Sequence, residues 1–163
     1  ISDVAVIPLP DFKQKMVQIG YLARTANLLG IATPKIACIA PSEQLLPNVI
    51  SSTEGALLAK MADRGQLGNV VVDGPLSLDV ALYKEVAEHK KVKGSSVAGD
   101  PDCLLFPNLE SANVFFKSVT HLCGGELAAM VAGTKVPCVL TSRGDTSKTK
   151  LYSIALACLA VKQ

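Results

Sequence analysis

The sequence predicts one α/β domain of three layers, with helices on both faces of a mostly parallel sheet. Three observations lead to this fold class. The chain has 163 residues, 49% of them hydrophobic, which is enough to bury one sizeable core. Short runs rich in β-branched residues alternate with segments of helical periodicity, as in repeated βαβ units. The strand expected at 69–73 has an uninterrupted apolar centre, Val70–Val72, as in a sheet covered on both faces.

The first half of the chain shows clear start and stop signals. Apolar residues recur at helical spacing after Asp11, in a stripe that includes Ile19 and Leu29, and Gly30 ends this helix. The other expected elements are a strand over 4–9 stopped by Pro8 and Pro10, a strand over 35–40, a loop over 41–50, a helix over 51–62 capped by Ser52 or Thr53, a strand over 69–73 and a helix over 77–89.

The second half predicts a strand over 103–106, a helix over 111–123, strands over 127–131 and 137–140, and a final helix over 147–161. This last helix has almost no polar face, because Leu151, Ile154 and Leu159 lie among alanines. A helix that is apolar all round needs burial on all sides. We therefore expect it to pack against a domain absent from this sequence. The chain starts at Ile1 with no initiator Met or leader, as expected of a fragment of a longer gene product.

Composition excludes several classes of protein. The 16 basic and 14 acidic residues are mixed along the chain, which argues against nucleic-acid binding. No apolar run approaches the roughly 18 residues of a membrane span. The five cysteines form no CxxC pair, so we expect buried thiols in a reducing, cytoplasmic compartment. The two histidines lie far apart in the sequence, so no metal site is expected.

The strongest candidate site is the junction between the strand at 137–140 and the final helix. It contains Thr141, Ser142, Arg143, Gly144 and Asp145. Unpaired N–H groups at a helix start attract anions, glycine permits close approach, and a guanidinium suits bidentate phosphate contacts. The alternative is structural, with Ser142 and Thr146 capping the helix and Arg143 paired with a carboxylate.

Two further segments follow expected strands, where ligands bind in open α/β sheets. Asp73 and Gly74 precede Pro75, and Asp73 alone is as compatible with a structural turn. Asn113 and Lys117 lie one helical turn apart, so both can face one ligand. No G-x-G-x-x-G motif follows a strand and no G-x-S-x-G motif surrounds Ser142, which favours direct transfer without a covalent enzyme intermediate.

Several segments together resemble the phosphate acetyl/butyryltransferase family, and its butyryl branch most. They are Asp73-Gly-Pro-Leu, Val97-Ala-Gly99, Phe106-Pro-Asn-Leu, Asn113-Val-Phe-Phe-Lys117, Lys135-Val-Pro137, Thr141-Ser-Arg143 and Lys150-Leu-Tyr-Ser-Ile-Ala155. The resemblance implies an isocitrate/isopropylmalate dehydrogenase-like fold of two α/β domains. Residues 1–145 would form the second domain, and residues 146–163 would return to the absent first domain.

The resemblance also implies reversible transfer of a short acyl group, butyryl or acetyl, between coenzyme A and inorganic phosphate. Coenzyme A is a substrate, no metal or prosthetic group is needed, and the enzyme is expected to be a homodimer. Ser142 and Arg143 carry over as catalytic residues, and Asp145, the remaining nearby carboxylate, is expected to be the third catalytic residue. Asp73, Gly74, Asn113, Lys117, Thr141 and Gly144 are the expected substrate-binding residues.

This chain departs from the family pattern at two places. Ala112 replaces a glycine before Asn113, and Lys148 with Thr149 stands where relatives carry carboxylates. These departures leave open an alternative function, a noncatalytic domain that binds coenzyme A or an acyl phosphate. On either interpretation the isolated fragment is expected to be inactive.

Overall fold

The computed structural model describes residues 1–161. The chain forms two compact units, Ile1–Asn113 and Val114–Gln163. The last two residues of the predicted C-terminal segment, 146–163, lie outside the described part. The division into domains at residue 145 stays a prediction.

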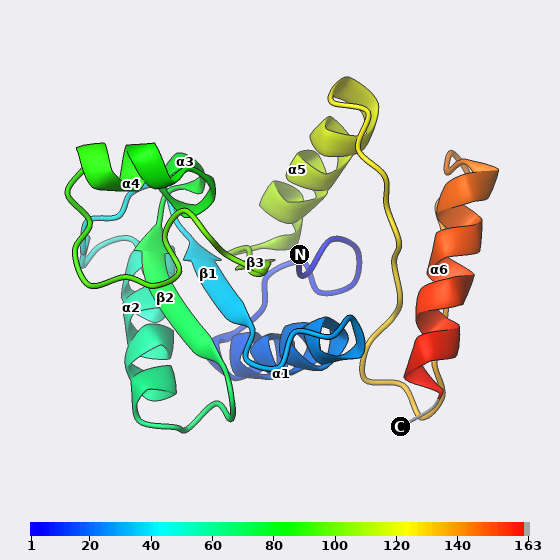
Figure 1. Ribbon diagram of the computed structural model, residues 1–163, viewed down its shortest axis with the longest axis horizontal. Helices are drawn as coiled ribbons and strands as arrows, with labels where there is room; N and C mark the ends of the chain where they lie inside the picture. Colours follow the sequence, from blue (N-terminus) through cyan, green and yellow to red (C-terminus); the bar gives the residue numbers. More distant parts are fainter. Residues whose placement is uncertain (162–163) are drawn as a thin grey trace. The chain divides into compact units, whose positions relative to one another are not determined.

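The first unit contains the sheet (Figure 1). Its strands are β1 (Lys35–Ile39), β2 (Val71–Leu76) and β3 (Cys103–Leu105), in the order β2-β1-β3. Both neighbours pair with the central strand β1 in parallel. Ser2 forms an isolated parallel bridge with Leu105. The predicted parallel sheet is therefore confirmed, as a small one.

Helices cover both faces of this sheet. On one face, α1 (Phe12–Leu28) and α2 (Ile50–Asp63) pack Ile19 and Leu58 against Ile36 and Cys38 of β1. Ala37 points to the other face because side chains alternate along a strand. There α3 (Leu78–Leu82) packs against β1 with Val80 fully buried. The first unit thus has the predicted three layers.

The ends of α1 follow the predicted signals. The Asp11 carboxylate accepts the N–H of Gln14 at 2.8 Å, and the Gln14 side chain accepts the N–H of Asp11 at 2.8 Å. This reciprocal capping box fixes the helix start. Gly30 has a φ of +92° just after the helix, a conformation that glycine adopts without strain. Leu29, expected on the buried stripe, is exposed because it is already the C-cap.

Two predictions for the amino-terminal half are wrong. Residues 4–9 form no strand. The Asp3 carboxylate accepts the N–H groups of Ala5, Val6 and Ile7, and these hydrogen bonds hold the segment in a turn around the Asp3 side chain. The cap of α2 is Val49, and no side chain caps it. Ser52 lies inside α2, where its hydroxyl accepts the N–H of Leu46 and donates to Gln44 O.

Two boundaries after residue 69 also differ from prediction. Strand β2 continues through Gly74 and Pro75 to Leu76, because the Ala40 N–H donates a hydrogen bond of 2.9 Å to Leu76 O. The helix expected at 77–89 is divided into α3 and α4 (Lys84–His89) by Tyr83, whose backbone is extended. Asp73 and Gly74 therefore lie within a strand and not at its end.

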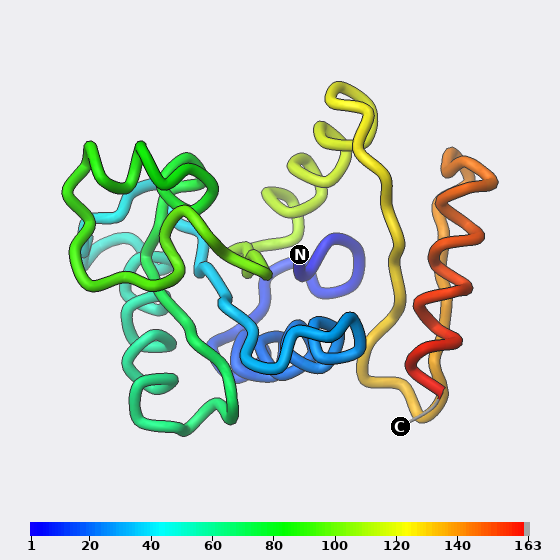
Figure 2. Tube along the Cα trace, viewed as in Figure 1, coloured from blue at the N-terminus to red at the C-terminus, as the bar shows by residue number. Residues whose placement is uncertain are grey.

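The second unit lacks the strands predicted at 127–131 and 137–140. Helix α5 (Leu109–Leu122) continues into this unit, and α6 (Ser147–Ala160) closes it. Between them the chain is mostly extended (Figure 2), with one antiparallel bridge between Val131 and Cys138. An isolated pair of strands is marginally stable in water, which explains why neither segment becomes a strand here. Helix α6 buries Ser153 and Ala157 but exposes Leu151 and Ile154.

Candidate functional site

The predicted junction forms a closed turn in the second unit. The Asp145 carboxylate accepts the N–H of Ser142 at 2.7 Å, and Asp145 N–H donates to Ser142 O at 3.1 Å. The Gly144 N–H lies 3.4 Å from the Ser142 hydroxyl oxygen, which accepts it. The Ser142 N–H, one of the backbone donors expected to bind phosphate, is therefore already hydrogen-bonded to Asp145. The Asp145 carboxylate holds the turn that presents Ser142 and Arg143.

The structural alternative for this junction is correct only for Thr146. The Thr146 hydroxyl accepts the N–H of Thr149 at 3.1 Å and caps α6, whereas Ser142 does not cap it. The Arg143 side chain is exposed, and within residues 1–161 no carboxylate forms an ion pair with it. The guanidinium therefore keeps its donors for an anion.

A cavity of about 280 Å³ lies beside this turn in the second unit. Its walls are the carboxyl end of α5, residues 124–127, and the first turns of α6 with Gly144 and Asp145. The threonine and tyrosine hydroxyls in the wall can donate or accept hydrogen bonds. This volume approaches the range of small-molecule sites.

One ion pair lies in the wall of this cavity, between Lys148 and Glu126. The hydrogen bond to Glu126 is the largest cause that raises the pKa of Lys148, and a hydrogen bond to Tyr152 adds to it. The same bond to Lys148 lowers the pKa of Glu126. Lys148 is therefore a protonated cation at neutral pH. Sequence reasoning missed Glu126, because 22 residues separate it from Lys148.

The other predicted site residues have partners outside the junction. The Asp73 carboxylate accepts the N–H of Gly74 at 2.8 Å. The Asn113 amide donates to Val4 O at 2.8 Å in the first unit. In the second unit, the Lys117 ammonium lies 4.3 Å from the centre of the Phe116 ring. The contiguous residues 141–145 form one turn, whereas these three side chains each have a separate partner.

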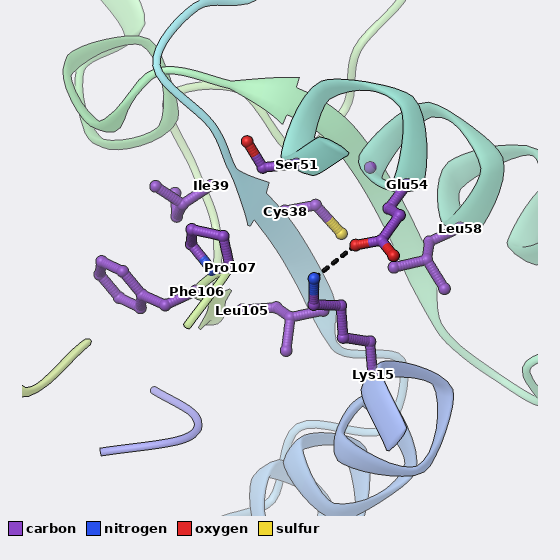
Figure 3. Close-up of a pocket in the computed structure, with 10 residues that line it drawn as sticks. Lys15, Cys38, Ile39, Ser51, Glu54, Leu58, Leu105, Phe106 and Pro107 are labelled. Carbon is purple, nitrogen blue, oxygen red and sulfur yellow. Dashed lines mark hydrogen bonds and ion pairs between the residues drawn. The ribbon is translucent and has the colours of Figure 1, made fainter. Parts of the chain in front are cut away.

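A smaller pocket lies in the first unit, at the carboxyl ends of β1 and β3 (Figure 3). Lys15 of α1 and Glu54 of α2 form an ion pair at its edge, and Cys38 lies beside it. Its volume of about 10 Å³ is room for a single water molecule. Burial, and secondarily Asp73, raises the pKa of Cys38 to about 12, so its thiol is unreactive at neutral pH.

No three or more His, Cys, Asp or Glu side chains in the described part of the chain are grouped to hold a metal ion. Among residues 1–161, no helix is both long enough and apolar enough to cross a membrane.

Known proteins resemble this chain over nearly its whole length. A family model described as phosphate acetyl/butaryl transferase matches residues 1–158. Phosphate butyryltransferase from Clostridium acetobutylicum is 43% identical over 159 residues, covering 98% of this chain and 52% of that protein. Phosphate acetyltransferase from Thermotoga maritima is 41% identical over 157 residues, covering 96% of this chain and 53% of that protein.

A solved structure agrees with these matches. The crystal structure of a branched-chain phosphotransacylase from Enterococcus faecalis V583 superposes with a TM-score of 0.88 at 31% identity, covering 98% of this chain and 56% of that chain. The chain therefore spans about half the length of the relatives that it matches.

Proposed function

Because the chain belongs to the phosphate acetyl/butyryltransferase family, we propose that it is part of an enzyme that moves a short acyl group reversibly between coenzyme A and inorganic phosphate. The observation that supports this activity best is the Arg143 guanidinium, exposed and without an ion-pair partner in the described chain, on a turn beside a cavity. A planar cation so placed suits an oxyanion of phosphate.

In this proposal the junction binds phosphate and stabilises the transition state. Arg143 binds the phosphate oxygens, and the Ser142 hydroxyl donates a hydrogen bond to the oxygen of the reacting carbonyl. A phosphate oxygen then attacks the acyl carbon, and the coenzyme A thiolate leaves. Asp145 holds this turn through Ser142 N–H, so we assign it a positioning role. Thr141 and Gly144 border the bound phosphate.

For Asp73, Gly74, Asn113 and Lys117, the substrate-binding role stays a prediction from the family resemblance. The expected homodimer and cytoplasmic location also stay predictions.

We further propose that the dehydrogenase-like architecture is completed by another α/β domain. Two features of the second unit support this. Helix α6 exposes Leu151, Ile154 and Leu159, and in the described chain the extended segments at 127–131 and 137–140 pair only with each other, at one bridge. Burial of such apolar side chains and pairing of such strands are both favourable. A second domain would supply these contacts.

The test is the change Arg143→Ala in the complete gene product, assayed with butyryl-CoA and phosphate by thiol release. Loss of a phosphate-binding guanidinium should lower turnover by about 10²–10³-fold. The control is Arg64→Ala, which removes an equally exposed arginine at the end of α2 and should leave turnover unchanged. Unchanged turnover in the Arg143 variant would remove the assignment. A wild-type protein that binds coenzyme A without turnover would instead support the noncatalytic alternative.

A further inference from the structure

The wall of the cavity in the second unit contains a cation that the proposed phosphate site does not use. Lys148 lies in the first turns of α6 and lines the same cavity as Gly144 and Asp145. Its ammonium forms the ion pair with Glu126 and lies 5.6 Å from the centre of the Tyr152 ring. An ammonium has three donors, and the hydrogen bond to Glu126 uses one of them.

The charges around Lys148 indicate which part of a ligand it can meet. The ionisable groups in the cavity wall are Glu126, Asp145, His121 and Tyr152, from residues 124–127, the junction, α5 and α6. Two carboxylate side chains thus accompany one lysine in this wall. Such a wall disfavours the adenosine phosphates of coenzyme A. The cavity can accept the uncharged arm of coenzyme A that ends in the thiol, and Lys148 is then the cation in the wall that can meet the sulfur.

We propose that the Lys148 ammonium is the counter-ion of the coenzyme A sulfur, held toward the cavity by Glu126. This proposal rests on the proposed acyltransferase function and adds a residue to it. A phosphate oxygen forms the new C–O bond, and the C–S bond breaks with its electron pair on sulfur. The thiolate that leaves is paired with the ammonium. In the reverse direction, the same pairing favours the thiolate that attacks the acyl phosphate.

The proton stays on nitrogen in this step. An ordinary thiol has a pKa near 8.5, and hydrogen bonding to Glu126 raises the pKa of Lys148 above its usual value. A thiolate beside an ammonium is therefore favoured over a thiol beside a neutral amine. Glu126 acts through Lys148 as a positioning residue. A nearby positive charge also lowers the pKa of a thiol, which gives the proposal a measurable pH signature.

The experiment measures acyl-CoA formation from butyryl phosphate and coenzyme A across pH 6 to 10 in the complete gene product. For Lys148→Met we expect the apparent pKa of the kcat profile to rise by about one unit, because the thiol loses its counter-ion. Turnover at pH 7 should fall about tenfold, and the difference from wild type should vanish above the thiol pKa. A defect of folding would lower the rate equally at every pH.

Two further variants make the result specific. Lys148→Arg keeps the charge and should keep the wild-type profile. Lys150→Met removes an exposed lysine of the same helix that does not line the cavity, and it should also keep the profile. A wild-type profile in Lys148→Met, or a shifted one in Lys148→Arg, would overturn the role of Lys148 and leave the acyltransferase function intact. Absence of turnover in the wild-type protein would overturn the proposed function itself.

Discussion

Two glycines, Gly74 of β2 and Gly55 of α2, lie where the packing leaves little room for a side chain. A Cβ added to Gly74 would lie 2.6 Å from the Cys38 Cβ, and one added to Gly55 would lie 3.3 Å from Pro75. The first contact is shorter than a packed interior tolerates, and the second is tight enough to require a small movement of the backbone at Pro75. The substrate-binding role of Gly74 stays a prediction, and the observed contact gives Gly74 a packing role between β1 and β2.

Gly74→Ala should therefore destabilise the protein by about 1–3 kcal/mol, through overpacking against Cys38. The matched control is Gly20→Ala in α1, where an added Cβ meets no atom within 4 Å. That change should stabilise the protein by about 0.5–1 kcal/mol, because alanine favours helix. Urea unfolding of both variants measures the difference. Equal midpoints would contradict the packing role.

At the scale of elements, a polar cluster ties α3 and α4 to the loop after β1. The Lys90 ammonium, just after α4, lies 3.0 Å from the Asp79 carboxylate and 3.5 Å from that of Glu43. The Ser77 hydroxyl, at the N-cap of α3, lies 3.2 Å from the Glu43 carboxylate, and it can donate its one hydrogen to Glu43 or to Asp79. This cluster connects the segments that leave β1 and β2 at their carboxyl ends. The sequence predicted only that Lys90 lies in a solvent-exposed stretch after a helix.

The cluster predicts a loss of stability in acid. Hydrogen bonds to Ser77 and then to Lys90 lower the pKa of Asp79 from 3.8 to about 2. A carboxylate with a lower pKa in the folded state stabilises it above about pH 4, and this stabilisation is lost as the pH falls toward 2. Lys90→Met should raise the pKa of Asp79, followed by carboxyl NMR, and reduce the acid-dependent part of unfolding. Lys93→Met, an exposed control, should change neither. A pKa near 2 in Lys90→Met would contradict the contribution of Lys90.

At the scale of the whole molecule, the two units differ in what holds them together. The first has a sheet whose central strand is buried along most of its length. In the second unit, the segment that connects α5 to α6 contains one isolated bridge, between Val131 and Cys138. Backbone hydrogen bonds with few buried apolar neighbours open at low free energy. The two units should therefore differ in local stability.

Native-state hydrogen exchange measures this difference. Amides of β1 should exchange orders of magnitude more slowly than those of residues 127–140, because β1 lies between two paired strands. In the complete gene product, the same amides of 127–140 should become protected if another domain supplies neighbouring strands. Equal exchange in the two segments of this chain would contradict the difference between the units.

Sequence reasoning worked best where the cause was local. Asp11 and Gln14 lie three residues apart, so the helix start was readable, and Gly30 marked its end. The strand at β1 followed from a short apolar run. The segments at 4–9, 127–131 and 137–140 have the same apolar character, but none of them is part of a strand here, because apolar character alone does not supply a strand to pair with.

The α/β class, the family and the order of most helices and strands followed from the amino-acid sequence, because spacing and capping act over a few residues. Tertiary structure alone decided which distant charges meet. Lys15 meets Glu54, and Lys148 meets Glu126, across 39 and 22 residues. It also placed the Asp145 carboxylate on Ser142 N–H. Such contacts depend on how the chain packs in three dimensions, which local periodicity does not encode.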